Sequence, residues 1–325
     1  MHMSDALVSP AVAAGAGIAA ATLIAVAASK VKKIGRDDII PLMGVMGAFV
    51  FAAQMINFSI PGTGSSGHVI GGILLSAVLG PWAAFITLCS VLIIQCLVFA
   101  DGGLLALGCN ILNMGVTSCL IAYPLIYRPI AGSSLKPWRI TLASIAASVV
   151  ALEIGAAGVT LETELSGITA LPTSTFLAFM LPIHLAIGAI EGIATAAVLC
   201  FLAKYRPETL YGEYVASESS GGGRVVSGSG SLRHVLIFFG IATLIFAGAF
   251  TWIASSNPDG LEWSIEKVSG ISEMPSATPP TAFMPGYDSR FAGIVGALIV
   301  MVMLWAITTI IFHRIRSAHS PHSED

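Results

Sequence analysis

The first two residues, Met1 and His2, carry nitrogen donors that suit a metal ion. The terminal amine, the amide nitrogen of His2 and the Nδ1 atom of its imidazole can close a five-membered and a six-membered chelate ring in one plane. A planar nitrogen set favours Cu(II) or Ni(II) and disfavours Zn(II), which prefers a tetrahedron. Because His2 is bulky, we expect Met1 to be retained. A fourth nitrogen must then come from the same side of the membrane.

His68 is the histidine placed to supply that fourth nitrogen. It ends the outer connection 57–68, in which Gly62, Gly64 and Gly67 give the loop freedom to fold inward. The other five histidines lie inside an apolar run (His184) or on the opposite side of the membrane (His234, His313, His319 and His322). From the residues alone, a chance His2 and a helix-capping His68 remain the alternative interpretation.

Polar residues in or near the apolar runs are candidates for supporting the ligands. Ionisable groups inside a membrane are functional candidates because their burial is costly. The residues that can orient a ligand or balance the charge of a metal are Asn57, Asp101, Asn110, Asn113, His184 and Glu191. For His184 and Glu191, hydrogen bonding that only fixes helix packing is the competing interpretation.

The composition identifies an integral membrane protein. The 325 residues are 55% apolar and only 10% charged, and the mean hydropathy is +0.87. Soluble domains carry about 25% charged residues, so soluble enzymes and nucleic-acid-binding proteins are excluded. The five Cys residues lie in or beside apolar runs without C-x-x-C spacing, and we interpret them as packing residues.

Nine apolar runs are candidate membrane spans, since about 20 residues cross a bilayer. They are 8–28, 41–56, 69–79, 82–100, 108–127, 139–159, 176–202, 234–254 and 291–312. A break at Gly80-Pro81 keeps the third and fourth runs separate. With the N-terminus outside, 13 of the 15 Lys and Arg residues then fall on the cytoplasmic side. We therefore expect an all-α protein of the bacterial inner (cytoplasmic) membrane, with its N-terminus outside and its C-terminus in the cytoplasm.

A Gly/Ser-rich linker, 206–233, divides the chain into two units. The first unit, 1–205, is expected to be a seven-helix bundle that binds the metal. The second, 234–325, is expected to have two spans and a short cytoplasmic tail. Its outer loop, 255–290, is rich in Pro and acidic residues and lacks helical periodicity, so we expect it to pack on something rather than fold alone.

Three segments resemble the CbiM/NikM family, the substrate-specificity (S) components of energy-coupling factor transporters for nickel and cobalt. They are Met1–Leu7, Met55–His68 and Asp101–Gly115, and the resemblance covers about residues 1–205. Residues 234–312, with the segment Asn257–Lys267, look like the small N component (CbiN/NikN type) fused to the C-terminus.

The resemblance implies a metal site and a set of partners. In that family the N-terminal amine, the amide and imidazole of residue 2 and a loop histidine hold the metal, which maps here onto Met1, His2 and His68. The implied partners are a transmembrane coupling (T) protein and cytoplasmic ABC-type ATPases, in addition to the lipid bilayer. The implied substrate is Ni(II), with Co(II) as the other candidate.

The sequence separates several classes of function. It contains no Walker A motif, so we expect a transporter subunit without its own ATPase, rather than an enzyme, and no nucleic-acid partner. The alternatives are a self-sufficient secondary metal transporter and a Co(II)-specific component that serves cobalamin synthesis. A membrane metal sensor or metalloenzyme is disfavoured because a filled nitrogen plane leaves no open coordination position.

Overall fold

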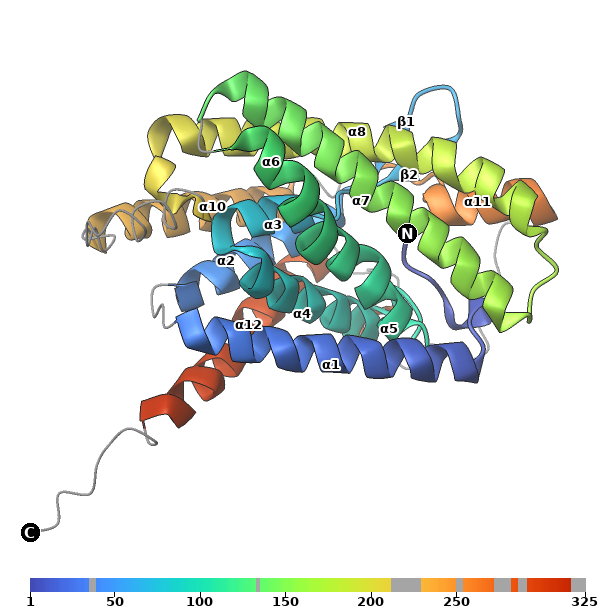
Figure 1. Cartoon of the computed structure of the whole chain (residues 1–325), viewed down its shortest axis with the longest axis horizontal. Helices are drawn as coiled ribbons and strands as arrows, with labels where there is room; N and C mark the ends of the chain where they lie inside the picture. The colour runs from blue at the N-terminus through green and yellow to red at the C-terminus, as the bar shows by residue number, and fades with distance from the viewer. Residues whose placement is uncertain are drawn as a thin grey trace, which may run out of the picture.

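Long apolar helices make up most of the protein (Figure 1). The computed structural model describes residues 1–34, 39–132, 135–211, 229–249, 254–271, 282–285 and 291–316. Within these residues, six helices are long and apolar enough to cross a membrane. They are α1 (Pro10–Ile34), α4 (Pro81–Phe99), the continuous run of α5 (Leu107–Asn110), η2 (Ile111–Tyr127) and α6 (Arg128–Ala131), α7 (Pro137–Ser166), α8 (Thr173–Tyr205) and α12 (Ala292–Arg316). The chain is therefore a mostly helical, multi-pass membrane protein.

Three of the nine expected spans are shorter than a full crossing helix. Two correspond to α2 (Ile39–Gln54) and to the apolar part, Leu232–Gly248, of α10 (Ser229–Gly248). The expected span 69–79 does not form a helix of spanning length, because α3 (Gly72–Leu79) has 8 residues, about 12 Å at 1.5 Å per residue. The break before α4 is present, since Gly80 has a φ of 82°, which favours glycine, and Pro81 begins α4.

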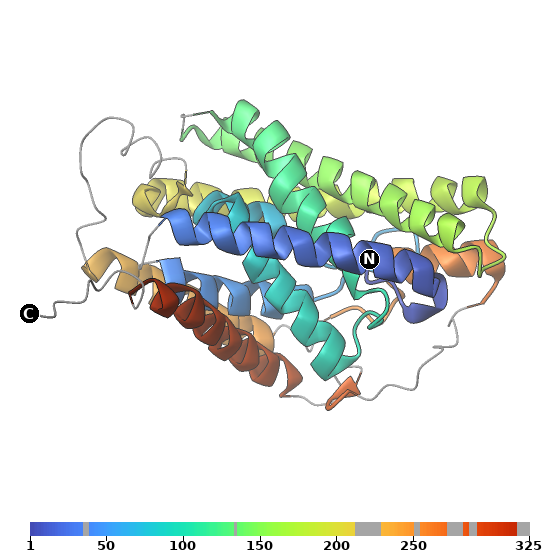
Figure 2. The same ribbon diagram turned by 60° about the horizontal axis from the view of Figure 1, so that its bottom comes forward.

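The loop before α3 carries a small antiparallel hairpin. Strands β1 (Phe58–Ile60) and β2 (Ser65–Gly67) pair Phe58 with Gly67 and Ile60 with Ser65. In the views of Figures 1 and 2, this hairpin, the N-terminal segment and α11 (Gly260–Ser269) gather toward the same end of the bundle. The last residues of α1, α6 and α8 and the first residues of α7 and α10 lie at the opposite end (Figures 1 and 2). The basic clusters of the sequence belong to these last segments, so the fold brings them together at one end.

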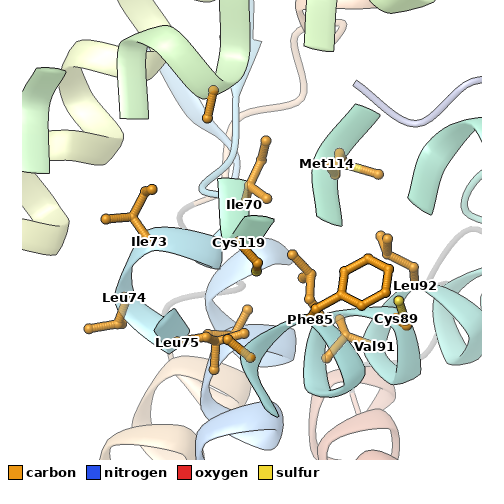
Figure 3. Packing of buried hydrophobic residues seen from close by; sticks show 14 of the residues in the cluster. Ile70, Ile73, Leu74, Leu75, Phe85, Cys89, Val91, Leu92, Met114 and Cys119 are labelled. Atoms are coloured by element: carbon orange, nitrogen blue, oxygen red, sulfur yellow. The ribbon is translucent and has the colours of Figure 1, made fainter. Parts of the chain in front are cut away.

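A buried core supports the start of α3 (Figure 3). Ile73 of α3, Phe85 of α4 and Cys119 of η2 are all fully buried in it. Ile70, which follows His68 by two residues, is 1% exposed and belongs to the same core. The core therefore anchors the chain two residues after His68, the predicted ligand. All five Cys residues are free thiols, and four of them are buried.

The C-terminal unit packs along the first part of the chain. Helix α12 contacts α2 and α4, α10 contacts α2, and α11 contacts α8. The expectation that 255–290 lacks helix is wrong, because α11 lies inside it. The sequence Asp259-x-x-Glu262 forms a capping box at the start of α11, with hydrogen bonds in both directions.

Some predicted segments lie wholly or partly outside the described residues. They are residues 212–228 of the linker 206–233, parts of the loop 255–290, and the tail after 316 with His319 and His322. The described ends of the linker hold the 3-10 helix η3 (Pro207–Thr209) and the first residues of α10.

Candidate metal-binding site

The N-terminal segment, 1–9, lies among the helices at the end of the bundle where α11 is found. Met3 is fully buried. Its backbone nitrogen donates to Oδ1 of Asn110 at 2.8 Å, and its carbonyl accepts from Nδ2 of Asn110 at 3.2 Å and from the backbone nitrogen of Gly103 at 2.8 Å. Asn110, expected as a supporting residue, thus holds the main chain directly after His2.

Two further contacts fix the register of this segment. The Met1 side chain is 4% exposed and lies against Gly155 of α7, where an added Cβ would stand 2.7 Å from Cε of Met1. The carboxylate of Asp5 accepts hydrogen bonds from the backbone nitrogens of Leu105 and Ala106, at 2.8 and 3.2 Å. The segment is therefore held at residues 1, 3 and 5.

The terminal amine of Met1 forms an ion pair with the C-terminal unit. Its nitrogen lies 2.5 Å from Oδ2 of Asp259. The other oxygen of Asp259 accepts from the backbone nitrogens of Leu261 and Glu262, both at 2.9 Å. Burial by itself raises the pKa of the Asp259 carboxyl, but the charge of the amine and the hydrogen bonds from the amine and from the backbone nitrogen of Glu262 outweigh it and hold the pKa below its ordinary value.

The imidazoles of His2 and His68 face each other. Their ring centroids are 5.2 Å apart and their planes differ by 13°. Nδ1 of His68 lies 3.2 Å from the carbonyl oxygen of Val69, which can only accept, so Nδ1 carries the proton and Nε2 of the neutral ring keeps its lone pair. Burial, the amine charge and His2 lower the pKa of His68 to about 3. The ring is therefore neutral and can bind a metal near pH 7.

The ring of His2 is held by a carboxylate. Its Nδ1 lies 2.8 Å from Oδ1 of Asp101, a residue expected to support the site, and its Nε2 is buried without a hydrogen-bond partner. The predicted chelate uses Nδ1 as a ligand. Ligation in that mode requires the imidazole to turn about its Cβ–Cγ bond, which brings Nδ1 away from Asp101.

The C-terminal unit also holds the hairpin that precedes His68. The backbone nitrogen of Ser66 donates to the carbonyl of Pro258 at 2.8 Å, and its hydroxyl donates to the carbonyl of Asn257 at 2.8 Å. Nε1 of Trp263 donates to the carbonyl of Thr63 at 3.0 Å. The segment before and at the start of α11 is thereby attached to the loop that carries His68.

Glu191 of α8 holds the other side of the same loop. Its two carboxylate oxygens accept hydrogen bonds from the backbone nitrogens of Ile70 and Gly71, both at 2.9 Å, and Glu191 is 1% exposed. A buried carboxylate with two main-chain donors restrains the loop two and three residues after His68.

The remaining predicted supporting residues lie farther from the ligands or act through other groups. Asn113 donates to Oε2 of Glu162 at 2.6 Å and contacts the sulfur of Met3 at 3.8 Å. Asn57 contributes its backbone carbonyl, which accepts from Ser255 at 2.7 Å. His184 places Nδ1 2.7 Å from the carbonyl of Met180, and its buried Nε2 has no partner.

Sequence reasoning missed Asp259 and Glu162. The capping-box pattern at Asp259 was visible, but it predicts a helix start and says nothing of the amine 258 residues away. Among the described residues, no three His, Cys, Asp and Glu side chains are grouped so as to hold a metal ion.

Comparison with known families divides the chain in two. Residues 2–209 match the family described as cobalt uptake substrate-specific transmembrane region. Residues 233–313 match the PDGLE domain.

Individual proteins agree with this division. The chain is 32% identical over 321 residues to a putative fused nickel transport protein NikMN of Archaeoglobus fulgidus, covering 95% of this chain and 98% of that protein. It is 31% identical over 316 residues to the fused nickel transport protein NikMN of Rhodobacter capsulatus, covering 90% and 85%. A crystal structure of a transition metal transporter superposes with a TM-score of 0.55 at 32% identity, over 63% of this chain and 93% of that one.

Proposed function

The chain belongs to the CbiM family of cobalt uptake transmembrane regions and carries a C-terminal PDGLE domain, and from this we propose that it captures Ni(II) for an ATP-driven importer. It is a membrane transport protein of the nickel and cobalt class, not an enzyme. The finer assignment to nickel rests on the planar donor set, since that geometry suits Ni(II), and on the fused nickel transport proteins it resembles. Co(II) is the second candidate substrate.

The observation that carries the proposal is the meeting of the Met1 amine, His2 and His68 in one buried place. On this proposal the four ligands are the amine, the amide nitrogen of residue 2, Nε2 of His68 and, once the imidazole has turned away from Asp101, Nδ1 of His2. The amine, the amide nitrogen and Nδ1 all belong to the first two residues, so they close five- and six-membered chelate rings with one metal ion. His68 arrives on a separate loop that Glu191 and the C-terminal unit restrain.

The proposed topology places this site outside. The basic segments gather at the opposite end of the bundle, which becomes the cytoplasmic end under the positive-inside rule. On this proposal, the seven-helix unit of residues 1–205 binds the metal and the unit of residues 234–325, with α10 and α12 in the membrane, covers it from outside, joined through the cytoplasmic linker.

The source of energy is proposed to lie in partner proteins. The chain has no phosphate-binding Gly-x-x-x-x-Gly-Lys sequence for ATP. A transmembrane coupling protein with cytoplasmic ATPases supplies the driving force on this proposal. A self-sufficient secondary transporter is the competing mechanism.

Reconstitution in liposomes separates these mechanisms. The purified chain alone and the chain with its coupling protein and ATPases are each loaded into vesicles, and uptake of Ni(II) and Co(II) is followed with and without internal ATP. We expect uptake only with partners and ATP. Uptake by the chain alone would assign it to secondary transport. Titrating Ni(II), Co(II), Cu(II) and Zn(II) into the purified chain ranks the substrates.

A further inference from the structure

Asp259 joins the two halves of the protein at the predicted metal ligands. One oxygen of its carboxylate caps α11 through the backbone nitrogens of Leu261 and Glu262, and the other meets the Met1 amine. The contact links a residue of the PDGLE domain to an atom that, in the proposed function, ligates the metal.

The position of Asp259 is fixed by its surroundings. The preceding residues, Asn257 and Pro258, accept hydrogen bonds from Ser66 of the hairpin. The following residue, Gly260, lies so close to α8 that an added Cβ would stand 2.9 Å from Cδ1 of Ile187 and 3.1 Å from Cε1 of His184. The carboxylate is therefore held over the ligand cluster by rigid contacts on both sides.

We propose that Asp259 is a positioning residue for metal capture, which holds the Met1 amine at the ligand cluster before the metal arrives and accepts an N–H from the same amine once the metal is bound. The inference rests on the proposed function, because it treats the amine as a ligand. An amine that binds a metal through its lone pair keeps two N–H groups, and one of them can continue to donate to Oδ2 of Asp259.

The charge of the metal-bound state favours this role over one in which Asp259 competes with the metal for the Met1 amine. A divalent ion with one deprotonated amide and three neutral nitrogens leaves one positive charge in a buried place, and a buried charge is costly unless it is paired. The carboxylate of Asp259 supplies the opposite charge at the amine. Hydrogen bonds to metal ligands typically change metal affinity by about 10- to 100-fold.

The variant Asp259→Asn tests the inference without removing the helix cap. Asn is as good an N-cap as Asp, so its side-chain oxygen can keep the contacts to Leu261 and Glu262. Its NH₂ group then faces the amine, and two donors cannot form a hydrogen bond. The matched control is Glu262→Gln, which makes the same change of charge on the same turn and keeps the capping box, since Gln also serves there.

Two measurements are made on the purified full chain, after intact mass has identified Met1 as its first residue. The first is the rate at which an amine-reactive ester labels the Met1 amine in the metal-free protein, read from the N-terminal peptide by mass spectrometry. The second is the affinity for Ni(II). We expect Asp259→Asn to label severalfold faster and to bind Ni(II) about 10- to 100-fold more weakly, while Glu262→Gln resembles the wild type in both.

The possible failures are distinguishable. Labelling of Asp259→Asn at the wild-type rate would overturn the inference because the amine is then not held by Asp259. Equal or tighter Ni(II) binding by this variant would overturn it too, and would make Asp259 a competitor of the metal. If the wild type binds neither Ni(II) nor Co(II), the proposed function fails, whereas the labelling arm still decides whether Asp259 holds the amine.

Discussion

The imidazole rings of His2 and His68 stack at a centroid distance of 5.2 Å, although one belongs to the N-terminal segment and the other to the loop after α2. Their shared position brings nitrogen donors from two distant segments to one place, and this is the basis for the predictions on metal binding.

We expect His68→Ala to abolish high-affinity Ni(II) binding while the protein stays folded. One of four nitrogens is lost, and His68 belongs to no helix, so no spanning helix is altered. The loss of affinity should exceed the roughly 10- to 100-fold typical of a residue that only supports a ligand. Titration calorimetry on the purified variant measures it. His234→Ala, a change at an exposed histidine of α10, is the control and should bind normally.

The loop that carries His68 should depend on Glu191. In Glu191→Gln, one backbone nitrogen of Ile70 and Gly71 keeps an oxygen acceptor and the other faces an NH₂ group, which leaves a buried donor unsatisfied at a cost of about 1–3 kcal/mol. We expect Ni(II) affinity to fall by about 10- to 100-fold. Glu153→Gln on α7 makes the same charge change at a partly exposed site and should have a smaller effect. Equal affinities for both variants would limit Glu191 to helix packing.

Ni(II) uptake should require His2 to follow the N-terminal residue directly. A Gly inserted between Met1 and His2, or an uncleaved N-terminal tag, should abolish Ni(II) uptake even though every side chain remains, because no side chain replaces the amine and the amide of residue 2. Initiation at Met3 should have the same result, and a C-terminal tag should be harmless. Bound Ni(II) should be diamagnetic and yellow-orange, as a planar nitrogen field requires. Uptake by an extended chain, with processing excluded by mass spectrometry, would falsify the chelate.

Acidification should weaken Ni(II) binding, and His68 should not be the cause. The metal competes with protons for the amine, the amide and His2, so affinity falls as pH falls. Burial lowers the pKa of His68 to about 3, so this ring stays neutral through the range of the experiment and releases no proton on binding. Proton release measured in weakly buffered solution should therefore be assigned to the N-terminal residues. A pH dependence that tracks titration of His68, for example by NMR of its ring, would contradict this.

The C-terminal unit should be required for uptake. A chain cut near residue 215 loses α10, α11 and α12, and with them the contacts to α2, α8 and the hairpin. We expect loss of transport in cells, and partial recovery when residues 229–325 are co-expressed, since the linker only raises the local concentration of the second unit. Membrane abundance of the cut chain, measured by immunoblot, controls for degradation. Full transport by the cut chain alone would refute the requirement.

Much of the fold could be predicted because it depends on local signals. Hydropathy located the long helices, and the Gly80-Pro81 pair located the break before α4 because one residue tolerates positive φ and the other begins a helix. The short length of α3 was not predicted. Residues 69–71 continue the apolar run of α3, but the backbone nitrogens of Ile70 and Gly71 donate to Glu191 of α8 instead of extending the helix.

The candidate site was predictable only where its donors are adjacent in sequence. The order Met1-His2 predicts a chelate, and His68 was selected because the other histidines are expected inside an apolar run or on the opposite side of the membrane. Asp259 could not be found in this way, because its partner is the first residue of the chain and no periodicity relates them. The helix α11 was missed for a different reason, as its capping box at Asp259 and Glu262 was present but outweighed by the Pro-rich surroundings.

The ion pair between Met1 and Asp259 also imposes an order on biosynthesis. Translation runs from Met1 toward the C-terminus, so Asp259 is made only after the described helices from α1 to α10 have been synthesised. Closing so long a loop is slow relative to local helix formation. Until Asp259 and α11 have been synthesised, the Met1 amine lacks this carboxylate partner, so this end of the protein completes its folding late in synthesis.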